Sequence, residues 1–111
     1  MNDAIYRELT ESLYNRIEEL IDLLIEEKDS ALDYENNSGV LTILCEDTDT
    51  QVIISRQQAS HEVWVAAKSG GFHCIYKNDQ WFCSKTNETL AALLTRTCSE
   101  QSSSPIDLTN L

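Results

Sequence analysis

The amino-acid sequence predicts an α+β fold, a two-layer α-β sandwich in which an N-terminal and a C-terminal helix pack on one face of a five- or six-stranded antiparallel sheet. Residues 3–27 and 88–98 repeat apolar side chains with the spacing of a helix, whereas the chain between them alternates apolar and polar residues. Short consecutive strands favour antiparallel pairing. Each helix offers a single apolar stripe, so we expect both to cover the same face of the sheet.

The length of 111 residues corresponds to one domain and excludes a two-domain enzyme with separate cofactor and substrate domains. The composition, 41% hydrophobic and 24% charged, is typical of a globular chain rather than a disordered one. We expect residues 1–98 to form this single domain. Residues 99–111 are polar and contain the only proline, and we expect them to form a loosely attached C-terminal tail.

Residues 3–27 predict one long amphipathic helix, capped by Asn2 or Asp3. At 100° per residue, its apolar side chains fall within a stripe about 80° wide. These are Tyr6, Leu9, Leu13, Ile17, Leu20 and Leu24. Carboxylates occupy a separate sector about 100° wide, nearly opposite that stripe. They are Glu8, Glu11, Glu18, Glu19, Asp22 and Glu26.

Six segments in the middle of the chain have the composition and alternation of strands. They are Leu32–Glu35, Val40–Cys45, Gln51–Gln57, Glu62–Ala67, Phe72–Lys77 and Gln80–Ser84. Residues 36–39, 46–50 and 78–79 predict turns, because Asn, Asp and Gly tolerate a positive φ. Gly70 and Gly71 are expected to break the chain before the fifth strand.

Residues 88–98 return to the helical period. Four residues share one face of this second helix: Leu90, Leu93, Leu94 and Thr97. We expect Thr86 or Asn87 to cap it and Glu88 to lie near the positive end of its dipole.

Charge is the strongest compositional signal, with 19 acidic against 8 basic residues and a net charge of −11. Residues 1–49 hold 14 acidic and 3 basic side chains, so the whole excess lies in the first half. This balance disfavours a nucleic-acid partner and an anionic membrane surface. The chain opens without a basic or apolar leader, and no run approaches 18 apolar residues, so we expect a cytoplasmic protein with reduced, mostly buried cysteines.

The carboxylate sector of the first helix continues into Glu27, Asp29, Asp33 and Glu35. Carboxylates three or four residues apart repel one another, so six of them on one sector lower the stability of the helix. Carboxylate oxygens suit hard cations such as Ca²⁺, Mg²⁺, Mn²⁺ and iron. The same sector could instead dock a basic partner, or simply keep the helix solvated.

Trp64 is the second candidate functional residue. If Val63 and Val65 face the helices, Trp64 lies on the open face of the sheet, where a large aromatic side chain is a common interface anchor. The histidines, His61 and His73, are too few for a zinc site, and no nucleophile elbow, P-loop or dinucleotide fingerprint is present. We therefore predict no catalytic residues.

The sequence resembles the frataxin family over residues 1–98. The matching residues begin with Met-Asn-Asp at the start, Ile17-Glu18-Glu19 with Asp22, and Gly39-Val40-Leu41-Thr42-Ile43. They continue through Ile53-Ile54, Arg56-Gln57, His61-x-Val63-Trp64-x-Ala66-x-Lys68-x-Gly70-Gly71-x-His73, Trp81, Cys83 and Glu88-Thr89. Ser55 and Ile75 depart from the pattern, since the family usually has Asn and Asp there.

The resemblance implies two helices on an antiparallel sheet, weak surface binding of Fe²⁺ or Fe³⁺, and a role in iron–sulfur cluster assembly through contact with the cysteine desulfurase and, as a second partner, the scaffold protein. Glu18, Glu19 and Asp22 match the family's iron-linked helix motif. With them we predict as metal ligands Asp3, Glu8, Glu11 and Glu26. The predicted partner-binding residues are Arg56, Gln57, Trp64 and His73.

We therefore expect a non-catalytic iron-binding regulator of iron–sulfur cluster assembly, monomeric without metal, in which other hard cations can substitute for iron. One alternative is an acidic interaction module whose metal binding is incidental. The other is a slow ferroxidase or iron store. A di-iron carboxylate site would need Glu-x-x-His motifs on facing helices, and neither predicted helix contains a histidine, which argues against fast ferroxidase chemistry.

Overall fold

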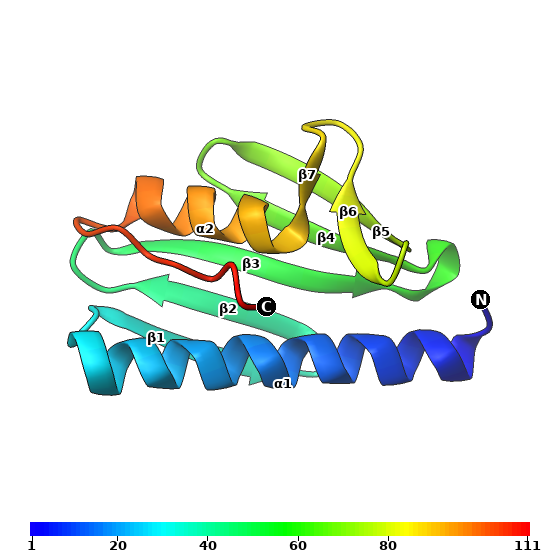
Figure 1. Cartoon of the computed structure of the whole chain (residues 1–111), viewed down its shortest axis with the longest axis horizontal. Coiled ribbons are helices and arrows are strands. Elements are labelled where there is room, and N and C mark those ends of the chain that lie inside the picture. Colours follow the sequence, from blue (N-terminus) through cyan, green and yellow to red (C-terminus); the bar gives the residue numbers. More distant parts are fainter.

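The computed structural model describes all 111 residues as two layers, a seven-stranded antiparallel sheet and two helices in front of one of its faces (Figure 1). Helix α1 (Asp3–Lys28) precedes the sheet and helix α2 (Leu90–Gln101) follows it. The strands lie side by side in chain order: β1 (Leu32–Asn37), β2 (Val40–Cys45), β3 (Thr50–Gln57), β4 (Glu62–Ala67), β5 (Gly70–Lys77), β6 (Gln80–Cys83) and β7 (Glu88–Thr89).

The predicted fold class is confirmed, but the sheet has seven strands rather than five or six. The additional strand is β7. Its two residues had been predicted to form the first positions of the second helix. Glu88 pairs with Cys83 in the sheet, and Thr89 is the N-cap of α2, accepting from the backbone N–H of Ala92 at 3.1 Å. The expected caps Thr86 and Asn87 were therefore wrong, because the chain completes a strand pairing before it turns into the helix.

Helix α1 begins after Asn2, whose side-chain oxygen accepts from the N–H of Ile5 at 2.8 Å, and ends at Asp29 in the left-handed conformation. Its buried face is turned about 40° from the predicted stripe. Leu9 and Leu24 are only half-buried. The fully covered positions instead include Thr10, Tyr14 and Ile21. Neither helix is long and apolar enough to cross a membrane.

Two tight turns have the backbone that their residues predict. Ser38 and Gly39 join β1 to β2 with φ of 51° and 87°, and Asn78 and Asp79 join β5 to β6 with φ of 51° and 62°. Two consecutive residues at positive φ form the turn whose twist matches a hairpin. The predicted turn at 36–39 was too long, since β1 continues to Asn37. The expected break at Gly70 was also wrong, because Gly70 already pairs with Ala67 inside the sheet.

Strand alternation divides the sheet into a covered face and an open face. The covered face contributes Leu41, Ile43, Val52, Ile54, Val63, Val65, Phe72 and Cys74 to a core of 24 buried residues. All four cysteines are free, as expected, and all four are buried, although only three were expected to be and the fourth was placed at a helix end. Burial raises the pKa of both Cys74 and Cys98 to about 12, so these thiols stay protonated and unreactive. The opposite face has no helix over it (Figure 1).

The end of the chain packs back onto the helices, contrary to the expectation of a loose tail. Helix α2 extends to Gln101, and Ile106 and Leu108 are 2% and 0% exposed. Ser99 Oγ exchanges hydrogen bonds with the backbone of Ile106, at 3.0 and 2.9 Å. The three large apolar residues of this otherwise polar segment, Ile106, Leu108 and Leu111, are too few to set up a period, so the sequence pattern gave no sign of this anchoring.

Replacing Leu108 by Ala should lower the free energy of unfolding by about 2–4 kcal/mol, because it removes a fully buried side chain and leaves a cavity. Chemical denaturation followed by circular dichroism measures this difference. Ser104→Ala, at an exposed position in the same segment, is the control and should change stability by less than about 0.5 kcal/mol. Equal stability of the two variants would mean that the segment is loosely attached after all.

Candidate functional site: an acidic helix beside an open sheet face

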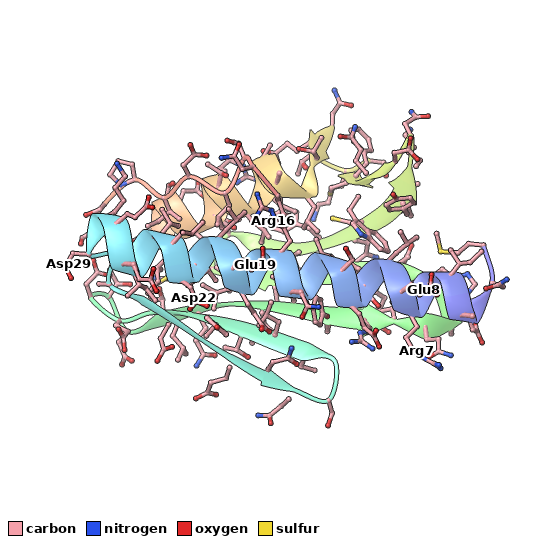
Figure 2. All side chains as sticks on the ribbon, turned by 60° about the horizontal axis from the view of Figure 1, so that its bottom comes forward. Arg7, Glu8, Arg16, Glu19, Asp22 and Asp29 are labelled. Atoms are coloured by element: carbon pink, nitrogen blue, oxygen red, sulfur yellow. The ribbon has the colours of Figure 1, made fainter.

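The carboxylates of α1 lie along the outer side of the helix. Figure 2 looks onto this side and shows Glu8, Glu19 and Asp22 on separate turns, with Arg7 and Arg16 as neighbouring cations. From Glu8 to Glu26 the axial separation is about 27 Å at 1.5 Å per residue. Glu8, Glu11 and Glu26 are exposed and form no hydrogen bond or ion pair with another side chain. They are the least compensated charges of this acidic surface.

Two of the carboxylates connect α1 to the edge strand β1. Glu18 accepts from the amide nitrogen of Asn36 at 2.9 Å, and Asp22 accepts from the Tyr34 hydroxyl at 3.1 Å. Burial raises the pKa of Tyr34, and the hydrogen bond to Asp22 raises it further. The acidic surface of α1 is therefore tied to the edge strand β1 through Tyr34 and Asn36, whereas Glu35, between them, is exposed on the opposite face of the sheet.

Two further carboxylates have basic partners. Glu19 forms an ion pair with Arg16 at 3.3 Å, and Arg16 also donates to the backbone oxygen of Asn110 at 3.2 Å. Asp3 Oδ1, in the first turn of α1, lies 2.8 Å from Nε2 of His61. Hydrogen bonding from His61 and then Gln58 holds the pKa of Asp3 below its ordinary 3.8.

Nowhere do three histidine, cysteine, aspartate or glutamate side chains converge in a geometry that could hold a metal ion. The reason is the straightness of α1, which spreads its carboxylates along a line rather than round a point. The donor set nevertheless suits iron chemically, because carboxylate oxygens are hard ligands. An arrangement of this kind favours weak, exchangeable binding in which water supplies most of the coordination sphere.

The open face of the sheet carries an aromatic cluster at its centre. The register places Trp64 on β4 directly between Ser55 on β3 and His73 on β5. The Trp64 and His73 rings are stacked, with centroids 4.2 Å apart and planes within 5°. Glu62, two residues earlier on the same face, accepts from Trp64 Nε1 at 2.8 Å. Val63 and Val65 are buried beneath the helices, so the predicted orientation of Trp64 is confirmed.

The other two predicted partner-binding residues lie at the end of β3, on opposite sides of the sheet. Gln57 pairs with Glu62, on the side of Trp64. Arg56 pairs with the buried Val63 and turns toward the helices, where its guanidinium lies 5.2 Å from the centre of the Tyr14 ring. Arg56 is therefore separated from the aromatic cluster, because adjacent strand residues point to opposite faces.

Comparisons with known proteins identify the family. The family model described as the Frataxin-like domain matches residues 1–104. The iron-sulfur cluster assembly protein CyaY of Vibrio vulnificus strain YJ016 is 38% identical over 107 residues, covering 96% of this chain and 98% of that protein. This chain belongs to the frataxin family. The resemblance inferred from the sequence is thus confirmed.

Solved frataxin structures have the same fold. The frataxin of Psychromonas ingrahamii is 35% identical, with a TM-score of 0.84 over 98% of this chain and 99% of that one. Trimeric frataxin from the yeast Saccharomyces cerevisiae is 20% identical, with a TM-score of 0.69 over 83% of this chain and 77% of the yeast chain. At that identity the yeast protein supports the fold alone.

Within this frataxin fold, the site includes residues that the sequence reasoning missed. Tyr34 and Asn36 contact the acidic helix from β1, and Glu62 fixes Trp64. The sequence could have indicated the contact of Glu62 with Trp64, because residues two apart on a strand point to the same face of the sheet. The pairing of Asp3 with His61 had no such signal, because 58 residues separate them.

The pairing of Asp3 with His61 should make α1 anchoring sensitive to acid. Since the folded pKa of Asp3 is lowered, its ionised form stabilises the fold fully above pH 3.8, and this contribution is lost as the pH falls through the folded pKa. Asp3→Asn should therefore be less stable than the wild type near neutral pH, and the gap should close as the pH falls below 3.8 and through the lowered pKa of Asp3. Urea denaturation from acid to neutral pH tests this; Glu35→Gln, an exposed residue, is the charge-matched control. A gap that persists undiminished in acid would rule out an ionic origin.

Proposed function

We propose that this frataxin-family protein acts in iron–sulfur cluster assembly as a non-catalytic regulator that binds Fe²⁺ or Fe³⁺ weakly on the acidic surface of α1 and docks on a cysteine desulfurase. The observation that carries this proposal is the row of uncompensated carboxylates beside an open sheet face, in a chain 38% identical to a protein named for iron–sulfur cluster assembly. The scaffold protein of the pathway is the second proposed partner.

Iron would serve such a regulator as a signal or cargo rather than as a resident cofactor. The proposed ligands are Asp3, Glu8, Glu11, Glu18, Glu19, Asp22 and Glu26. Glu8, Glu11 and Glu26 support this role most strongly, because no protein group competes for their oxygens. Each bound cation also relieves repulsion along the helix, so binding should stabilise the fold by mass action.

Docking would use two different contributions. The excess negative charge lies in residues 1–49, so the acidic helix would draw a basic partner surface and set the rate of association and its salt dependence. Trp64, with Gln57 and His73 beside it, would then act as the apolar anchor that slows dissociation. Arg56 could take part only from the rim, because its side chain lies over Tyr14.

Two other functions compete with this one. An acidic interaction module with incidental metal binding would dock on the same partner regardless of iron. A ferroxidase or iron store would need clustered ligands, and both helices lack the histidines of a di-iron motif. The lack of three convergent ligands favours the regulator over this second alternative.

Replacing Glu8, Glu11 and Glu26 together by Gln should weaken Fe²⁺ binding about tenfold, because it removes three attractive charges without touching the buried face of the helix. Anaerobic calorimetry gives the affinity, and NMR gives the site. The control replaces Glu46, Asp49 and Asp79 by amides, an equal charge change outside α1. If both triple variants lose affinity equally, only net charge matters and the acidic surface is not a site.

Trp64→Ala should weaken binding to the desulfurase by about 2 kcal/mol or more while leaving iron affinity unchanged. Glu18→Lys with Glu19→Lys should weaken both, since these charges serve the metal and the partner alike. Surface plasmon resonance at two salt concentrations separates the rates. If Trp64→Ala loses binding only in proportion to unfolding, Trp64 serves the core rather than an interface. Unchanged desulfurase binding by both variants would contradict the docking proposal.

A further inference from the structure

Two of the four cysteines face each other across neighbouring strands. Strands β5 and β6 are antiparallel with Ile75 opposite Phe82, so the next pair along the same register is Cys74 opposite Cys83. Both side chains are 0% exposed on the covered face of the sheet. Burial raises the pKa of Cys74, and the adjacent Cys83 thiol raises it further. The other two cysteines, one on β2 and one on α2, have no cysteine opposite them in the sheet.

The turn of the β5–β6 hairpin decides how close the two thiols are. Its two residues both have a positive φ, and in such a turn the residues on either side are joined by a hydrogen bond. Bonded and non-bonded pairs alternate from there, so the pair of Cys74 and Cys83, three pairs further along, is non-bonded. The Cα atoms of such a pair are about 4.5 Å apart, within the range of about 4.4–6.8 Å that a disulfide spans. Tyr76 and Trp81 form the other non-bonded pair, and their rings pack edge to face with centroids 5.2 Å apart.

The edge of the sheet offers a route to these buried thiols. Cys83 is the last residue of β6, and its outer neighbour is the edge strand β7. Only two pairings hold β7 in the sheet, Phe82 with Thr89 and Cys83 with Glu88. The Arg96 guanidinium donates to both carboxylate oxygens of Glu88, at 3.0 and 2.9 Å, and so connects β7 to α2. Release of this ion pair and of two pairings would uncover Cys83 while the rest of the fold stays intact.

We propose that Cys74 and Cys83 are a modification site, at which a small disulfide such as oxidised glutathione converts them into a reversible cross-strand disulfide when β7 opens. Cys83 loses its proton to water and attacks one sulfur of the oxidant, which releases one small thiol and leaves a mixed disulfide on Cys83. Cys74 then attacks the Cys83 sulfur and displaces the second small thiol. In total the two protein thiols lose two electrons and two protons, and the oxidant becomes two thiols.

The order of the two steps follows from the surroundings of the thiols. In the closed fold both are inaccessible, and the raised pKa of Cys74 makes it a poor first nucleophile, so the first attack falls to Cys83 at the edge. The second attack is intramolecular between facing residues, and this proximity offsets the small thiolate fraction of Cys74. The inference goes beyond the proposed function, because neither a metal nor a protein partner takes part.

The site is tested by treating the reduced protein with oxidised glutathione, alkylating the remaining thiols and digesting with trypsin. Cleavage after Lys77 separates the two cysteines, so the disulfide should join peptides 69–77 and 78–85, with a mass lower by two hydrogens. Cys45 and Cys98 should still be recovered as alkylated thiols, which reports an intact core. Reduction with dithiothreitol should restore both free peptides. Oxidation of all four cysteines at one rate would mean that only global unfolding exposes them, and would overturn the inference.

Two serine variants test the order of attack. Cys74→Ser should stop at the mixed disulfide and carry glutathione on Cys83, whereas Cys83→Ser should leave Cys74 unmodified. Cys74→Ala and Cys83→Ala repeat the comparison without a hydroxyl in the core, and circular dichroism shows which variants are folded. Glutathione on Cys74 in a folded Cys83 variant, or none on Cys83 in a folded Cys74 variant, would contradict the proposed order.

The route through the edge strand is tested with Glu88→Ala. Without the ion pair to Arg96, β7 should open more often, and the disulfide should form about two- to fivefold faster. Glu100→Ala is the matched control, because it removes the other carboxylate partner of Arg96, at 3.4 Å, without touching β7. Its rate should equal that of the wild type. Equal rates in all three proteins would overturn the route through β7.

Discussion

The packing of one face of α1 against the sheet is the contact on which the rest of this frataxin structure depends. Seven strands with strict alternation give the sheet one apolar face, and α1 and α2 can cover only that face. The proposed function uses the surfaces that remain exposed after this packing. The outer side of α1 and the open side of the sheet are the two surfaces that core formation does not consume.

Two tyrosines connect this packing to the proposed interface. Tyr14 donates from α1 to the backbone oxygen of Gly39 at 2.7 Å, and burial raises its pKa, so the hydroxyl remains a donor. Tyr6 donates to the backbone oxygen of Glu62 at 2.6 Å and accepts from the N–H of Gln57 at 3.0 Å. Tyr6 thus joins the ends of β3 and β4 at the residues that flank Trp64. The helix that carries the acidic surface also fixes the sheet positions beside the aromatic cluster.

The two surfaces differ in how specific they can be. Charges spaced along a straight helix act at a distance and suit attraction and weak metal exchange, because no single position encloses a ligand. The aromatic cluster acts at contact, since a hydrogen bond and a stacked ring hold Trp64 in one orientation. The charge of α1 would therefore attract many basic partners, whereas the contacts with Trp64 would decide which of them binds specifically. Iron bound on α1 would change the electrostatic attraction more than it would change the contacts at the sheet.

Local pattern determined much of this protein. The period of α1 placed its carboxylates on the outer side, strand alternation placed Trp64 opposite its buried valine neighbours, and the residues of the turns predicted the positive φ that the two hairpins require. These features depend on neighbours within a few residues. The motifs that resembled frataxins also sufficed to identify the family.

The tertiary structure alone decided what depends on distant residues. It turned the buried face of α1 toward Tyr14 and Ile21, assigned Glu88 to a strand, and seated Leu108 against the helices. It also brought His61 to Asp3 and stacked His73 on Trp64. These contacts form between segments that are far apart in the sequence and that compete for the same buried space. The periodicity of any one segment therefore does not predict them.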